Sequence, residues 1–398
     1  MKLLYLEARK GILRRYIFIV FVLFLCLNTV KIDMDYHAGD IRPVAGNVSS
    51  MQTGYSQIYD QVRGTITEET AGFVAVNYQR LNELISDGTY SRERQTDTYS
   101  GYLYGDFYLF HKYFYPSMEY SVHYRSYAES ILKQAAENQI QYQALDNTAD
   151  AAKSTYILAH YADRNIRSFY IYDGWDSLLS YDFSDFLILL LLILTIAPIF
   201  TREKETGMTL ILHSCRRGRW HLLLSKCGVS VLFVCITTLL FSLANFITFG
   251  ILCGFAGGAS PLYAIESYKN TPYSGSIFSF YILCTVLKAF GFSVISLVLT
   301  LLSACFRKTL YPCLIGFGIG LIFCFLAGWS VSPIWWQEIL ALSSPLTLTK
   351  GSELFANLYG AGIGGFYLLR INVLLIVQFI ITRLLVYIIG RKSCYRLN

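Results

Sequence analysis

Charged residues stand out at two places in a chain that is otherwise strongly apolar. The first place is the stretch 200–226, which has two acids near its start and basic residues near its end. This order favours a short surface helix, because the helix dipole stabilises acids at the N-terminus and cations at the C-terminus. Such side chains recognise a charged partner rather than break bonds. The residues predicted to make this contact are Glu203, Glu205, Gly207, Arg216, Arg217, Gly218 and Arg219.

Lys288 is the second candidate, as part of a translocation path, because it interrupts a long apolar run. An unpaired ammonium group near the middle of a bilayer costs at least ~2.5 kcal/mol. Lys288 either faces an aqueous cavity or an anionic part of a transported molecule, or it belongs to a shifted helix and reaches the interface. The sequence leaves these alternatives open. We expect no acid inside any membrane span, and we place Asp182 and Asp185 outside the second one.

The sequence lacks the usual signatures of an enzyme. It contains no G-x-x-x-x-G-K-[ST] motif, so the chain has no ATP-binding P-loop of its own. The ten cysteines include no C-x-x-C pair and the six histidines are scattered, which argues against a metal site. We therefore expect a protein that is not an enzyme and binds no cofactor itself, so that any ATP is bound by a partner subunit.

Composition defines the elements that must position these residues. Of 398 residues, 54% are hydrophobic and 15% are charged, and the mean hydropathy is +0.42. These values are too apolar for a soluble domain, so the chain is predicted to be an integral membrane protein. The net charge of +6 comes from basic residues at the ends of apolar runs, which indicates orientation in a bilayer and no nucleic-acid partner.

The apolar runs predict an α-helical membrane protein with six transmembrane helices. Residues 1–15 form an interfacial segment before the first helix, so that 1–30 is one unit, and 183–398 holds the other five helices. Short loops rich in Lys and Arg stay in the cytoplasm, which places both termini and the loop 201–226 on that side. The predicted spans are 16–30, 186–200, 227–254, 277–305, 310–329 and 368–390.

The stretch 31–182 is acidic, rich in tyrosine and free of any run long enough to cross a bilayer. It is predicted to be an extracellular domain with a helix-rich α+β fold, inserted between spans 1 and 2. Thr67 is expected to cap a helix that runs toward Ile85. Further predicted elements are helices at 127–143 and 148–163, a strand at 166–172 and a turn at Asp173–Gly174.

A second stretch, 331–367, lies between the last two spans and is too long for a simple turn. Its tryptophans and prolines predict short helices at the outer membrane interface, because tryptophan is favoured there. The glycines of 360–365 are expected to form a flexible link.

The charged loop resembles the corresponding loop of the ABC type-2 exporter permeases, especially those of Gram-positive bacteria. The resemblance implies a bacterial plasma-membrane permease that docks through this loop on a separate ATP-binding ABC subunit and pairs with a second permease subunit. That second subunit would be either an identical or a different chain, and membrane lipid would surround both. The matching residues are Phe200, Glu203, Gly207, Leu210, Leu212, Ser214, Arg217, Gly218, Arg219 and Lys226.

Two other functions fit the same pattern. The alternative is a membrane sensor or resistance module, in which the outer domain binds an antimicrobial peptide or a cell-wall lipid and the spans relay occupancy to a partner. An acidic, tyrosine-rich domain is compatible with cationic peptides. A membrane-embedded enzyme is the third reading, and the lack of clustered His, Asp or Glu in the spans argues against it.

Overall fold

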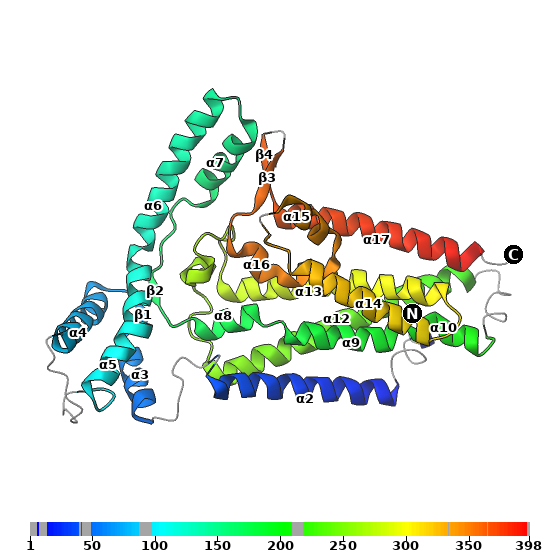
Figure 1. Ribbon diagram of the computed structural model, residues 1–398, viewed down its shortest axis with the longest axis horizontal. Helices are drawn as coiled ribbons and strands as arrows, with labels where there is room; N and C mark the ends of the chain where they lie inside the picture. The colour runs from blue at the N-terminus through cyan, green and yellow to red at the C-terminus, as the bar shows by residue number, and fades with distance from the viewer. Residues whose placement is uncertain are drawn as a thin grey trace.

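The computed structural model describes residues 6–7, 14–39, 41, 49–86, 98–208, 218–332, 334–363 and 365–395 of the chain. Long helices run side by side in an elongated bundle, and a second group of helices lies at one end of it (Figure 1). We call this second group, residues 49–172, the head domain, and we call the adjoining end of the bundle the head end. The opposite end is the loop end.

Within the described residues, six helical stretches are long and apolar enough to cross a membrane, which confirms the predicted number. The fourth of them has the predicted boundaries, and it packs against four of the other five stretches. The stretches are built from α2 (Arg15–Ala38), from α8 (Asp173–Ser180), α9 (Phe183–Ile196) and α10 (Pro198–Glu205), and from α12 (Gly218–Cys253), α13 (Ile277–Cys305), α14 (Leu310–Ala327) and α17 (Arg370–Tyr395).

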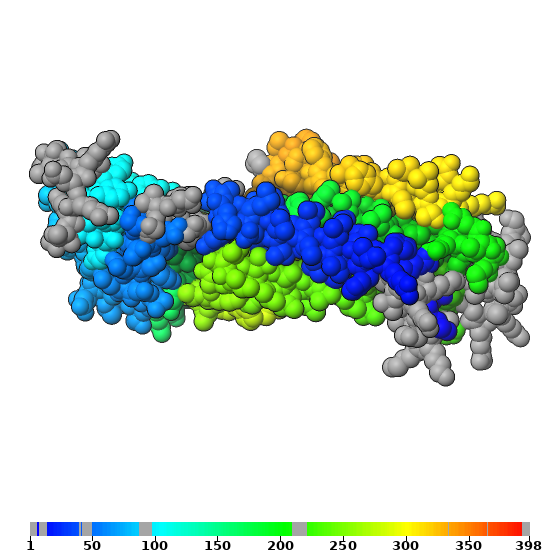
Figure 2. Space-filling model, turned by 90° about the horizontal axis from the view of Figure 1, so that it is seen from below, coloured from blue at the N-terminus to red at the C-terminus, as the bar shows by residue number. Residues whose placement is uncertain are grey.

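The helices α2 and α12 extend well beyond their predicted limits. The first, α2, continues to Ala38, where Gly39 ends it with a φ of 91°. An ion pair between Lys31 and Asp35, one turn apart, supports this extension. Figure 2 shows α2 as a dark blue helix on the surface of the bundle, where it packs against α9 and α12.

The helix α12 begins at Gly218 instead of residue 227. Its first turns are held by an apolar cluster in which Leu223 and Cys227 join Phe200 and side chains of α13 and α17. The end of the predicted loop is therefore helical and packed.

The head domain consists almost entirely of helices. Its strands β1 and β2 pair only Gly64 with Phe169 and Thr65 with Ser168, so the predicted strand at 166–172 is reduced to two residues. The elements are α3 (Ser49–Val62), β1 (Gly64–Thr65), α4 (Glu68–Ser86), α5 (Leu103–Leu109), the π-helix η1 (Phe110–Phe114), α6 (Tyr115–Ala144), α7 (Thr148–His160) and β2 (Ser168–Phe169).

Local sequence signals explain part of this domain. The backbone N–H of Thr70 donates to Thr67 Oγ1 at 3.2 Å, which confirms Thr67 as the cap of α4. The predicted helix 127–143 is the second half of the longer α6.

The predicted turn at Asp173 is wrong, because α8 begins there and packs closely on α12. A Cβ atom on Gly174 would lie 2.6 Å from Cβ of Cys253, so this packing requires glycine.

The stretch 331–367 contains short helices, as predicted, and also a hairpin. The flexible link predicted at 360–365 is wrong, because Gly360 pairs with Leu369 and Ile363 pairs with Phe366. Gly365 lies between β3 and β4 and has a φ of 84°, a backbone conformation that favours glycine. The elements are α15 (Trp335–Ser343), the 3-10 helix η4 (Pro345–Lys350), α16 (Gly351–Ala356), β3 (Gly360–Ile363) and β4 (Phe366–Leu369).

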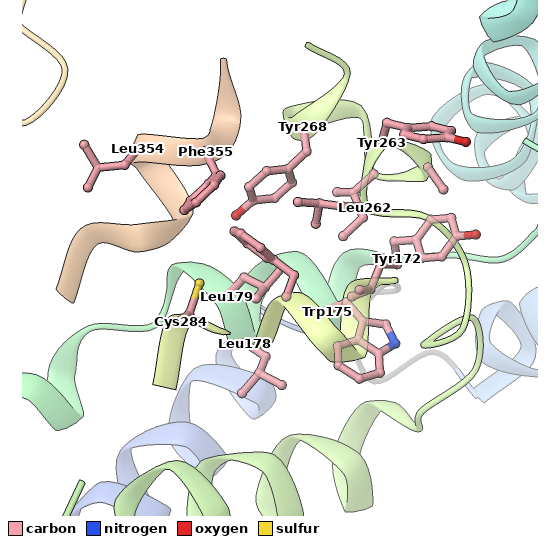
Figure 3. Packing of buried hydrophobic residues seen from close by; sticks show 14 of the residues in the cluster. Tyr172, Trp175, Leu178, Leu179, Leu262, Tyr263, Tyr268, Cys284, Leu354 and Phe355 are labelled. Atoms are coloured by element: carbon pink, nitrogen blue, oxygen red, sulfur yellow. The ribbon is translucent and has the colours of Figure 1, made fainter. Parts of the chain in front are cut away.

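A continuous apolar core joins the head domain to the bundle. It runs from α6 through α8 and the α12–α13 connection to α13 and α16, and Figure 3 shows Tyr268 and Phe355 pointing toward one another in it. The α12–α13 connection includes the 3-10 helices η2 (Leu262–Ala264) and η3 (Glu266–Tyr268). Burial of this core fixes the head domain on α13.

Tyrosine hydroxyls add hydrogen bonds to the same junction. Tyr120 donates to the carbonyl of Tyr263 at 2.7 Å, and Tyr124 donates to that of Lys269 at 3.0 Å. Two more hydroxyls donate to Asn270, one to its side chain and one to its carbonyl. We call this set the tyrosine clasp, and its members are Tyr120, Tyr124, Tyr127 and Tyr161.

Candidate functional site

Lys288 lies on α13 and faces a carboxylate from α9. Its Nζ is 3.0 Å from Oδ2 of Asp185, and it donates to Oδ1 at 3.1 Å. The two side chains are only 15% and 11% exposed. The expectation that no acid lies inside a span is therefore wrong, because α9 begins at Phe183 and includes Asp185 in its first turn. The helix dipole stabilises an acid at that position, and the ion pair offsets the cost of burying Lys288.

A cavity of about 690 Å³ opens beside this pair, between α2, α9, α14 and η4. Asp185 lines it, and Lys288 lies behind Asp185. Phe183, Phe186 and Leu346 contribute apolar surface. We call this space the charged cavity, and its charged lining residues are Lys31, Asp35, Asp182, Asp185 and Lys350.

Every acid that lines the charged cavity has a basic partner in the described structure. Asp35 pairs with Lys31, Asp185 pairs with Lys288, and Asp182 accepts a hydrogen bond from Lys350 at 3.0 Å. A ligand that carries both an anion and a cation can exchange with such a pair, because each of its charges then meets one of the two separated partners. The cavity therefore suits a molecule that has both charged groups and apolar surface.

At the loop end, Lys204 binds the last turn of α13. Its Nζ donates to the carbonyls of Ser303 at 3.2 Å, Ala304 at 2.6 Å and Phe306 at 2.9 Å. These carbonyls have no partner within their own helix, and a cation there is favoured by the helix dipole. Lys204 on α10 therefore fastens the α9–α10 stretch to α13.

Two predicted docking residues form internal contacts at the same end. Glu203 is buried, and its Oε2 lies 2.5 Å from Nζ of Lys226, whose side chain has no exposed surface. Lys226 also donates to the carbonyl of Ile199 at 3.0 Å. Oε1 of Glu205 accepts a hydrogen bond of 2.7 Å from the backbone of Thr309. Both acids thus hold the bundle together where the charged loop begins.

The other predicted docking residues are placed only in part. Gly207 has a φ of 71°, so it ends α10 in a conformation that favours glycine. Arg216 and Arg217 lie outside the described residues. Gly218 and Arg219 are the first two residues of α12. Their role in docking remains a prediction.

Sequence reasoning identified Lys288 but missed Asp185, Lys204 and the inward role of Lys226. Lys288 and Asp185 are 103 residues apart, so no local spacing connects them. One signal was present: a buried lysine requires a partner, and Asp185 directly precedes the predicted second span. No group of three or more His, Cys, Asp or Glu arranged to hold a metal occurs among the residues that the structure describes.

Comparison of the chain with protein-family models, with curated proteins and with solved structures found no match. Function must therefore be argued from the site itself.

Proposed function

We propose that this chain is the membrane-spanning permease subunit of an ATP-driven exporter of the ABC type-2 class. One observation carries the proposal: two helical stretches connect the charged cavity with the loop end. The α9–α10 stretch holds Asp185 near one end and Lys204 near the other. The helix α13 holds Lys288, and its last turn accepts the hydrogen bonds of Lys204.

This connection gives a physical route from the loop to the cavity. A packed helix moves as a rigid body, so a displacement of α10 or of the end of α13 is transmitted along the bundle. An ATP-binding partner that binds one arrangement of the loop more tightly than another would shift the cavity between two states. The chain itself would bind no ATP.

The distribution of charge supports one orientation. Arg202, Lys204, Arg307 and Lys308 all lie at the loop end, and short loops rich in Lys and Arg stay in the cytoplasm. In this orientation both termini are cytoplasmic and the head domain is extracellular, in the plasma membrane of a bacterium. A second permease subunit, identical or different, would complete the transport path.

Purification from the native host in a mild detergent tests the proposal. We expect a stoichiometric partner with a P-loop, and ATP hydrolysis by the complex. Arg217→Glu should abolish the association, since this residue belongs to the predicted docking surface. Glu203→Lys cannot serve this purpose, because it would place a second cation beside the buried Lys226.

A second pair of variants tests the connection itself. Lys204→Met should leave the partner bound but lower the ATP hydrolysis that depends on the complex, because the loop is detached from α13. Lys308→Met is the matched control, since this exposed lysine lies at the same end. Purification without any ATP-binding partner, or equal hydrolysis in both variants, would contradict the proposal.

A sensor is the second candidate, and the tyrosine clasp favours it. The clasp ties the head domain to the connection that leads into α13, so a ligand on the head domain has a route to the same helix. A partner that is a kinase rather than an ATP-binding transport subunit would decide for the sensor.

A further inference from the structure

A second cavity, separate from the charged cavity, lies where the head domain meets α12 and α13. Its volume is about 910 Å³, which is within the range of ligand pockets. Its two charged lining residues come from the segment just before β2, and further polar residues come from the α12–α13 connection. Aromatic residues come from the segment after β2, from α8, α12 and α13, and from the same connection. We call it the aromatic cavity, and its lining includes Asp163, Arg167, Trp175, Phe246, Phe255 and Phe278.

The aromatic cavity borders the surface that faces lipid. Phe278 stands at the head end of α13 and is 45% exposed. Ile282 and Val286 follow at intervals of four residues, so they continue the same face of the helix, and they are 49% and 59% exposed. An apolar chain lying on this face would enter the bilayer directly from the cavity.

Two opposite charges line the cavity without pairing. Asp163 and Arg167 are both exposed, and their side chains form no ion pair or hydrogen bond within the described part of the chain. Their charged atoms are therefore further apart than a salt bridge allows. A ligand with a separated anion and cation would satisfy both.

The aromatic wall is held in place by close packing. Trp175 donates its indole N–H to the carbonyl of Ala256 at 3.0 Å. A Cβ atom on Gly258 would lie 2.7 Å from Cζ2 of Trp175, so glycine is required beside the ring. The rings of Phe246 and Phe255 stack at a centroid distance of 4.1 Å. The wall is preorganised, which lowers the entropy cost of binding.

We propose that the aromatic cavity binds a phospholipid whose head group carries a phosphate and a primary amine. Arg167 would bind the phosphate, because a guanidinium group can donate hydrogen bonds to two phosphate oxygens at once. Asp163 would accept hydrogen bonds from the ammonium group. The acyl chain would leave over Phe278 and follow the exposed face of α13. This inference does not depend on the proposed transport function.

Native mass spectrometry of the purified protein tests the proposal. The delipidated protein is titrated with phosphatidylethanolamine or with phosphatidylglycerol of the same acyl chains, and the bound fraction is measured for each. We expect tighter binding of phosphatidylethanolamine. Arg167→Gln should weaken the binding of both lipids by about tenfold, the value of one hydrogen bond to a charged group. Arg125→Gln is the control, because Arg125 is exposed on the head domain and pairs with Glu129.

Asp163→Asn separates this proposal from a general effect on folding. Asp163 has a φ of 58°, a conformation that asparagine also adopts readily, so the variant should fold normally. It should lose the preference for phosphatidylethanolamine but retain phosphatidylglycerol. Three results would overturn the proposal: equal binding of both lipids by the wild type, an unchanged preference in Asp163→Asn, or full competition by inorganic phosphate.

Discussion

The head end and the loop end of the bundle are held together by different chemistry. At the head end, the tyrosine clasp uses neutral phenol groups, three of which donate to main-chain carbonyls. At the loop end, Lys204 donates to carbonyls of α13, and Glu203 pairs with Lys226, so these contacts involve full charges. The two junctions therefore differ in the cost of losing a single partner.

The difference follows from solvation. A neutral hydroxyl that loses its acceptor gives up a hydrogen bond worth about 1 kcal/mol. A buried charge that loses its partner costs about 3–5 kcal/mol, because the remaining charge stays away from water. Lys226 has no exposed surface and the Glu203 side chain is 5% exposed, so their pair belongs to the second class. The head end therefore gains its hydrogen-bond stability from several small terms, and the loop end from contacts that each involve a full charge.

The largest effect is expected for Lys226→Met. This change takes the ammonium group away from the buried Glu203 carboxylate, 2.5 Å from it, and from Glu7, 3.9 Å from it, so the free energy of unfolding should fall by about 3–5 kcal/mol. Chemical unfolding in a fixed detergent, followed by circular dichroism, measures the change.

The double variant Lys226→Met with Glu203→Gln is the control for this prediction. It removes the lysine together with its nearest acid and should recover most of the lost stability, since two neutral groups are cheaper to bury than a carboxylate that has lost its nearest cation. If it proved as unstable as Lys226→Met, the lysine would act mainly through its contact with the Phe200 ring, 4.4 Å from its Nζ. The contrast between the two junctions would then fail.

The second largest effect on stability is expected at alkaline pH, through the tyrosine clasp at the head end. Burial raises the pKa of Tyr124 to about 12, from an ordinary value of 10.0, although the nearby Arg164 opposes the shift. The unfolded chain therefore loses this proton first, and stability falls as the pH rises between the two values. The contribution is intact below about pH 10, and its loss amounts to about 2–3 kcal/mol.

The measurement is the free energy of unfolding from about pH 9 to about pH 12, for the wild type and for Tyr124→Phe. The variant should show the shallower decline. Lysines also titrate in this window, and equal slopes in the two proteins would assign the decline to them instead of the tyrosine clasp.

Sequence reasoning succeeded where a single segment carries its own signal. The length and hydropathy of α13 fixed both of its ends, and Thr67 fixed the start of α4. It failed where tertiary packing decides. The start of α12 depends on the burial of Leu223 and Cys227 against other helices, and no local signal before position 227 predicted that start.

The candidate site shows the same division. The buried position of Lys288 is visible in its apolar surroundings, but Asp185 reaches it from another helix. The spacing of Tyr120, Tyr124 and Tyr127 places them on one face of α6. Two of these hydroxyls bind main-chain carbonyls, and a carbonyl is present at every residue, so the sequence holds no sign of which one is used.

The smallest effect is expected for Tyr124→Phe at neutral pH. The ring of Tyr124 stacks on that of Tyr263 with centroids 4.9 Å apart and an interplanar angle of 3°, and phenylalanine keeps this contact. The change therefore removes only the hydrogen bond to Lys269, and stability should fall by about 1 kcal/mol. Tyr142→Phe on the same helix is the matched control, because its hydroxyl forms no hydrogen bond within the described residues. A loss near that of Lys226→Met would show that the head junction, too, depends on a single contact.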